Sequence, residues 1–229
     1  MENGYAAGAM TRWRTLHEVT CVALLLDAGG DELAERYLLH EFVETRKALL
    51  QYQKCQPLLG HAPISKREAA EIERNYQALL ARFGKPFGED YGWAAAHLGN
   101  DRPGFAHVEE AAGRAMMRSH YKLASQNVHA GTKGIASRLG VPDDRYAAVA
   151  GATNFGFLSP GHNVALSLAQ ICSVMVPKNG SVDTIADLAA LNMLVERVGR
   201  VLARAQRAIR RDAQEETKRK PRARRGSDR

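Results

Sequence analysis

The stretch SVDTIADLAALNMLVERVGRVLARAQRAIR, residues 181–210, decides the fold class of this chain. Its apolar side chains recur at spacings of three, four and seven residues, which is the period of one face of an α-helix. They are Ile185, Leu188, Val195, Val198, Leu202, Ala205 and Ile209. Such a seam either packs across a helical body and projects from it or pairs with a second copy. The second arrangement predicts a homodimer, and the pattern leaves both open.

The same helical spacing recurs along most of the chain, whereas the alternation of apolar and polar residues that marks half-buried strands is scarce. The sequence therefore predicts an all-α fold, a compact bundle of about six helices with two long irregular loops and a disordered basic C-terminal tail. The expected helices cover residues 11–29, 31–57, 65–83, 105–129, 159–177 and 181–213. We expect a flexible N-terminus (1–10), a single helical domain (11–212) and a tail (213–229).

Local signals place the ends of these helices. Gly29-Gly30 stops the first helix and Pro57 ends the second, because proline lacks the backbone donor that a helix needs. Ser65-Lys66-Arg67-Glu68 has the form of a capping box. Ser159-Pro160 combines an N-cap residue with proline at the first helical position.

The positive charge of the chain is concentrated at its C-terminal end. The whole chain has 32 Lys and Arg against 25 Asp and Glu, a net charge of +7. Residues 200–229 hold twelve Lys and Arg against four Asp and Glu, a balance of +8, so residues 1–199 are close to neutral. The basic character therefore describes the tail and not the body.

The tail predicts contact with RNA or other nucleic acid. Its basic side chains without interleaved aromatic residues offer phosphate contacts and little reading of sequence, so binding would be salt-sensitive. The candidates are Lys218, Arg219, Lys220, Arg222, Arg224 and Arg225. A solubilising extension is the alternative interpretation.

Other composition signals narrow the class of protein. Cys21, Cys55 and Cys172 are scattered without a CxxC pair, and we expect Cys21 and Cys172 to be buried because they sit in apolar runs. No signal peptide or membrane span is expected, so we expect a cytoplasmic protein. The histidines lack HxxxH or HExxH spacing, and no phosphate-binding loop occurs. The sequence thus predicts neither a metal nor a cofactor.

The most suggestive polar cluster lies on the expected helix 105–129. Tyr121, Ser125 and His129 are spaced at i, i+4 and i+8 along one face, and Arg118 lies near the edge of that face. A histidine beside an arginine suits RNA cleavage, because histidine moves protons near neutral pH and arginine stabilises charge on the phosphate. The alternative is the polar face of an amphipathic helix.

Two further pairs stand four residues apart on earlier helices. Arg14 and Glu18 form either an exposed ion pair or, if they point inward, a network with Tyr121, Ser125 or His129. Arg36 and His40 form either a binding pair or a solvated face.

Several motifs together resemble the bacterial domain-of-unknown-function family numbered 5677, over about residues 11–176. They are Trp13-Arg14-Thr15-Leu16-His17-Glu18, Ala34-Glu35-Arg36-Tyr37, Asp90-Tyr91-Gly92-Trp93, residues 121–130 (YKLASQNVHA) and Pro160-Gly161-His162. The helical layout is more remotely similar to the HEPN (higher eukaryotes and prokaryotes nucleotide-binding) superfamily. Arg114 and His120, with five residues between them, match the arginine-to-histidine spacing of its enzymes.

The remote resemblance implies a metal-independent ribonuclease of a toxin or phage-defence system, with His129, Ser125 and either Arg14 or Arg118 around the scissile phosphate. The alternative is a non-catalytic helical module that binds a nucleotide, nucleic acid or protein partner. In that module, Arg14, Glu18, Tyr121, Ser125 and His129 form a buried structural network.

Overall fold

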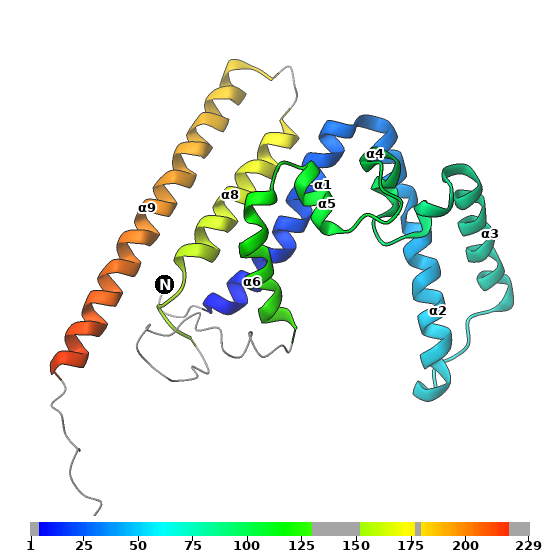
Figure 1. Ribbon diagram of the computed structural model, residues 1–229, viewed down its shortest axis with the longest axis horizontal. Coiled ribbons are helices and arrows are strands. Elements are labelled where there is room, and N and C mark those ends of the chain that lie inside the picture. Colours follow the sequence, from blue (N-terminus) through cyan, green and yellow to red (C-terminus); the bar gives the residue numbers. More distant parts are fainter. Residues whose placement is uncertain (1–4, 130–151, 177–179, 220–229) are drawn as a thin grey trace, which may run out of the picture. The chain divides into compact units, whose positions relative to one another are not determined.

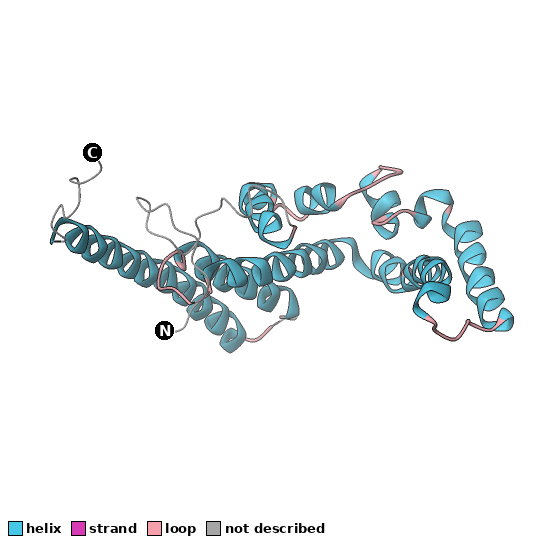
Figure 2. Cartoon of the chain, turned by 90° about the horizontal axis from the view of Figure 1, so that it is seen from below, coloured by secondary structure: helices cyan, strands magenta, loops and turns pink. Residues whose placement is uncertain are grey.

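The computed structural model describes residues 5–129, 152–176 and 180–219. Within these ranges every regular element is a helix and there is no strand (Figure 2). The all-α fold predicted from the sequence is therefore confirmed. Residues 1–4 of the expected flexible N-terminus (1–10), most of the second predicted loop (130–151) and residues 220–229 of the predicted tail lie outside the described residues. Residues 6–10 are not flexible as expected, because they form the start of α1 and Met10 is buried.

The first helix, α1 (Ala6–Leu39), contains the break that the sequence predicts at Gly29-Gly30. Gly30 has φ 68° and ψ −164°, a conformation that glycine adopts at little cost. The later helices are α2 (Glu41–Leu59), α3 (Lys66–Phe83), α4 (Ala95–Leu98), α5 (Phe105–Ala111), α6 (Arg118–Val128), α8 (Leu158–Met175) and α9 (Val182–Arg219). Short 3-10 turns are η1 (Lys85–Gly88), η2 (Gly92–Ala94) and η3 (Ala115–Met117).

The chain forms two compact units. The first comprises residues Met1–Thr20 and Ser119–Arg229, so it holds the start of α1 together with α6, α8 and α9. The second comprises Cys21–Arg118, which holds the rest of α1 and the elements from α2 to η3. The single domain over residues 11–212 stays a prediction.

Helices α8 and α9 of the first unit lie side by side (Figure 1). Glycines bring them close, because a Cβ at Gly199 would lie 3.0 Å from Nε2 of His162 and one at Gly161 would lie 2.6 Å from Cδ1 of Leu202. Val195 is buried on the inner side of α9. The predicted seam is only partly covered, since Ile185 is 63% exposed.

The buried indole of Trp13 connects the start of α1 to α8. Its Nε1 donates a hydrogen bond to Oγ of Ser167, which is also buried, at 3.1 Å. Met10 on α1, Ala124 on α6 and Ala169 on α8 complete the core of this unit.

Two side chains, Arg36 at the end of α1 and His40 directly after it, hold the segment between α3 and α4. Nε of Arg36 donates to the carbonyl of Trp93 at 3.0 Å, and Nε2 of His40 donates to the carbonyl of Glu89 at 2.9 Å. Both side chains are buried, so the alternative of a solvated face is wrong for this pair. Pairing of these backbone carbonyls with buried side chains gives the loop a fixed shape.

Several predicted boundaries are confirmed. Ser65 caps α3, because its Oγ accepts a hydrogen bond from the backbone N–H of Glu68 at 3.2 Å. This helix ends at Phe83 before Gly84, as predicted. The helical turn expected within the first loop is present as η2 and α4.

Other boundaries differ from the prediction. The helix expected over 31–57 is divided at His40, and α2 continues past Pro57 to end at Gly60, whose N–H donates to the carbonyl of Gln56. The helix expected over 105–129 is divided into α5, η3 and α6, because Gly113 has φ 68°. Arg114 is therefore not one helical turn before Arg118.

Differences also occur near the C-terminus. Helix α8 begins at Leu158, so Ser159 lies inside its first turn and is not the N-cap. Helix α9 extends to Arg219, so the part of the predicted tail from residue 213 to 219 is helical. Cys21 is buried as predicted, whereas Cys172 is exposed.

None of the helices in the described ranges is both long enough and apolar enough to cross a membrane.

The burial of His40 predicts a pH-dependent stability. Burial lowers the pKa of His40 from its ordinary value of 6.5, because the charged imidazolium is desolvated, and the nearby Glu44 only partly opposes this. His40 therefore binds a proton more readily in the unfolded chain than in the folded one. Its contribution to the free energy of unfolding is fully present above pH 6.5 and falls as the pH drops below that value. Urea unfolding at a series of pH values measures the loss.

The substitution His40→Gln should flatten that pH dependence, because glutamine does not titrate and still offers a donor to the carbonyl of Glu89. The matched change His61→Gln, at an exposed histidine, should leave it unchanged. An unaltered pH slope in His40→Gln would contradict the assignment.

Candidate functional site

The first unit contains a polar network between α1 and α6. Arg14 and Glu18 come from α1, one turn apart, and Tyr121 and Ser125 come from α6, also one turn apart. Their facing positions follow from the helical period, which puts residues i and i+4 on one side. The inward orientation that the sequence left open is therefore the one found for Arg14 and Glu18.

Arg14 is the centre of this network. Its Nη2 lies 2.9 Å from Oε1 of Glu18 and donates to the Tyr121 hydroxyl at 2.9 Å, while its Nε donates to Oγ of Ser125 at 3.1 Å. The Tyr121 hydroxyl donates in turn to Glu18, and the Ser125 hydroxyl donates to the carbonyl of Tyr121 at 3.0 Å. Every one of these four side chains thus has a partner within the network.

The network is only partly open to solvent. The side chains of Arg14 and Glu18 are 24% and 29% exposed, and Tyr121 is buried. Burial, and the hydrogen bond to Glu18, raise the pKa of Tyr121 to about 12. The phenol therefore stays neutral near pH 7 and acts there as a hydrogen-bonding group.

Two aromatic side chains, Trp13 and His17, lie beside the network. The buried His17 ring lies 5.1 Å from the ring of Trp13 and 6.0 Å from that of Tyr121. Both belong to the motif of residues 13–18, and they are four residues apart on α1, but the sequence did not assign them to the network.

The candidate histidine is placed differently. His129 directly follows the last residue of α6, and its backbone N–H donates to the carbonyl of Ser125 at 3.1 Å. Its side chain is exposed, and no hydrogen bond or ion pair joins its imidazole to another residue of the described chain. The structure therefore brings four of the predicted network residues together and leaves His129 out of their hydrogen bonds.

Arg118 has a different partner, which the sequence analysis missed. Its Nη1 lies 3.1 Å from Oε2 of Glu109, a carboxylate that is fully buried on α5. A buried carboxylate needs a compensating cation, and Arg118 supplies one. Glu109 could not be singled out from the sequence, because the break at Gly113 that aims Arg118 at it was not predicted.

The remaining predicted residues lie elsewhere. Arg36 and His40 belong to the second unit. Lys218 and Arg219 are the last described residues of the basic tail and end α9. The others, Lys220, Arg222, Arg224 and Arg225, lie outside the described residues.

A search of the described part of the chain finds no group of three or more His, Cys, Asp and Glu side chains placed to hold a metal ion.

Over the described ranges the chain is helical, and the polar network between α1 and α6 pairs its members with one another. A model of a family of unknown function (DUF5677) matches residues 1–146, more than half of the chain. The chain belongs to this family. The match includes every residue of the network, whereas the Pro160-Gly161-His162 motif and helices α8 and α9 lie beyond it. No curated protein and no solved structure matches the chain.

The network predicts a stability loss when the Tyr121 hydroxyl is removed. Tyr121→Phe keeps the ring but leaves Glu18 and Arg14 each without one hydrogen bond, which should cost about 1–2 kcal/mol of unfolding free energy. Denaturant unfolding measures it. Tyr37→Phe, at a residue that is 41% exposed, is the matched control and should change stability by less than about 0.5 kcal/mol. Equal effects of the two substitutions would rule out a stabilising network.

Proposed function

We propose that this protein is a non-catalytic helical module whose binding partner is another protein, a second copy of the chain, held through α9. The observation that carries this proposal is an exposed apolar stripe on α9, opposite the side that packs on α8. This homodimer uses another face of the helix than the predicted seam, of which the stripe contains only Ala205.

The outer stripe of α9 consists of Ala186, Ala190, Met193, Leu194, Val201 and Ala205. Its largest members, Met193, Leu194 and Val201, are 71%, 53% and 54% exposed. The spacing keeps them on one face for about 30 Å of helix. The exposed Arg197 lies on the same face between Met193 and Val201. Exposed apolar surface on one helix face marks interaction sites.

Charge along α9 favours an antiparallel partner. The N-terminal part has the exposed Asp183 and Asp187 and no Lys or Arg before Arg197, whereas Arg200, Arg204, Arg207 and Arg210 follow. A register centred between Met193 and Leu194 puts Asp183 opposite Arg204 of the second copy. Such complementary charges set the orientation of paired helices.

The network of the first unit supports the non-catalytic part of the proposal. The positive charge of Arg14 is compensated by Glu18, and its Nε and Nη2 atoms donate to Ser125 and Tyr121. Turning these two atoms toward a scissile phosphate would break three internal contacts. A structural role explains the same geometry without that cost.

A change of one stripe residue tests the partner. Leu194→Glu puts a charge in the middle of the apolar stripe, so the mass measured by light scattering after size exclusion should fall from dimer to monomer. Leu58→Glu is the matched control, because Leu58 is 88% exposed on α2, and it should stay dimeric. A monomeric wild type at micromolar concentration would contradict the proposal.

A pair of charge reversals tests the orientation. Asp183→Arg should weaken the dimer, because it places arginine opposite Arg204, and adding Arg204→Asp should restore it. Sedimentation equilibrium measures both dissociation constants, with about a tenfold loss and recovery expected. No recovery in the double variant would exclude this register.

A metal-independent ribonuclease is the second candidate, and the exposed imidazole of His129, one turn after Ser125, is the observation in its favour. In that function His129 transfers protons, Ser125 and either Arg14 or Arg118 lie around the phosphate, and the basic tail from residue 213 holds RNA or other nucleic acid. A toxin or phage-defence role belongs to this candidate.

Incubation of labelled RNA with purified protein in EDTA separates the two functions. The non-catalytic module predicts that the wild type and His129→Ala both leave the RNA intact. Cleavage by the wild type that is lost in His129→Ala, with an unchanged melting temperature, would overturn the proposal and establish the ribonuclease.

A further inference from the structure

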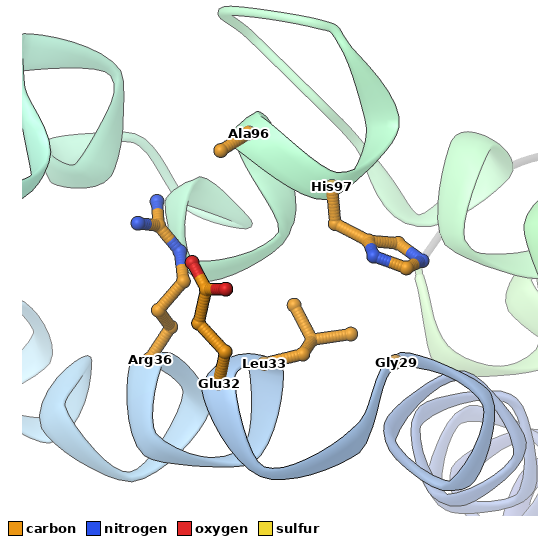
Figure 3. A pocket seen from close by; sticks show the side chains of 6 residues that line it. All are labelled: Gly29, Glu32, Leu33, Arg36, Ala96 and His97. Atoms are coloured by element: carbon orange, nitrogen blue, oxygen red, sulfur yellow. The ribbon is translucent and has the colours of Figure 1, made fainter.

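A cavity of about 240 Å³ lies within the second unit, between the part of α1 after Gly30 and helix α4. Gly29, Glu32, Leu33, Arg36, Ala96 and His97 line it. Figure 3 shows that the side chains of Glu32 and Arg36 rise from α1 toward α4, from which His97 comes. The size suits a small metabolite and not a nucleic acid strand.

Arg36 is the most constrained residue of this cavity. It is 6% exposed, and its Nε is held by the carbonyl of Trp93. Its guanidinium carbon lies 4.6 Å from the centre of the Phe83 ring and 5.4 Å from that of Phe87. These contacts fix the plane of the guanidinium.

The outer nitrogens of Arg36 are not used by these contacts. Across the described residues, its Nη atoms have no hydrogen bond, and no carboxylate lies within 4.0 Å of its guanidinium. These Nη atoms are not among the buried side-chain atoms without a partner, so they remain accessible from the cavity. Two N–H donors held in one plane can bind a carboxylate in a bidentate manner, with one hydrogen bond to each of its oxygens.

Glu32 brings the opposite charge to the same cavity. It is exposed and stands four residues before Arg36, a spacing at which such pairs usually join. Nevertheless, within the described chain Glu32 has no ion pair or hydrogen bond, and it acts on Arg36 only through longer-range attraction. The cavity therefore presents a cation and an anion that are not paired with each other.

The rest of the lining is small or apolar. Leu33 is buried, and Ala96 of α4 also lines the cavity. Gly29 lets the Leu33 side chain pack against the backbone of α1, because a Cβ at position 29 would lie 2.3 Å from Cδ2 of Leu33. These residues leave space for a short apolar group beside the two charges.

We infer that this cavity binds a small zwitterion with the head group of an amino acid. Its carboxylate is held by the Nη atoms of Arg36, its ammonium group by the carboxylate of Glu32, and its side chain lies over Leu33 and Ala96. Glu32 would repel an anion that lacks the ammonium group, which is why free phosphate fits less well. This inference is independent of the proposed dimer, because α9 belongs to the other unit.

Thermal shift of the full chain with each of the standard L-amino acids, at millimolar concentration, tests the ligand class. At least one should raise the melting temperature, since a ligand that binds only the folded state stabilises it. The controls are inorganic phosphate and two analogues of the amino acid that gives the largest shift. One analogue is the carboxylic acid without the amino group, and the other is the amine without the carboxylate. All three should have little effect on the melting temperature. No shift with any amino acid, or an equal shift with phosphate or either analogue, would overturn the inference.

Two substitutions test the site, and both spare Arg36, whose contacts hold the fold. Glu32→Gln should weaken binding of the best amino acid about tenfold in calorimetry, and Ala96→Trp should abolish it by filling the cavity. Glu41→Gln, at another exposed glutamate, is the matched control and should bind normally. Unchanged affinity in folded Glu32→Gln or Ala96→Trp would place the ligand elsewhere.

Discussion

The guanidinium of Arg14 imposes the constraint on which the first unit depends. Arginine keeps its charge at any physiological pH, so an arginine held between two helices needs an anion and hydrogen-bond acceptors beside it. Glu18 provides the anion, and Tyr121 and Ser125 provide the acceptors from α6. The positions of α1 and α6 are thus fixed by directional contacts as well as by the apolar core around Trp13.

These contacts bear on which groups of the protein can contact a ligand. A charge that is compensated inside the protein contributes little to an outside ligand, so the network favours structure over chemistry. Two other features contain groups that no other part of the described chain covers or pairs. The outer stripe of α9 is apolar and uncovered, and the cavity at Arg36 contains charges that are not paired with each other. We therefore propose that recognition takes place at these two features and that the network stabilises the fold.

Sequence patterns predicted the helices and much of the network, because helical period and capping chemistry are local. The break at Gly30, the N-cap at Ser65 and the i, i+4 pairs on α1 and α6 are examples. Features that depend on tertiary contacts were missed. The positive φ of Gly113 divides one predicted helix and sends Arg118 to Glu109, and the carbonyls of an irregular loop bury Arg36 and His40. Nothing in the spacing of these residues identifies such partners.

A double-mutant cycle between Glu18 and Tyr121 tests the central claim most directly. Unfolding free energies of the wild type, Glu18→Gln, Tyr121→Phe and the double variant give the energy that the two residues share within the network. A structural network predicts a coupling of about 1 kcal/mol or more, because both residues also hold Arg14. A coupling near zero, with additive single effects, would contradict the account.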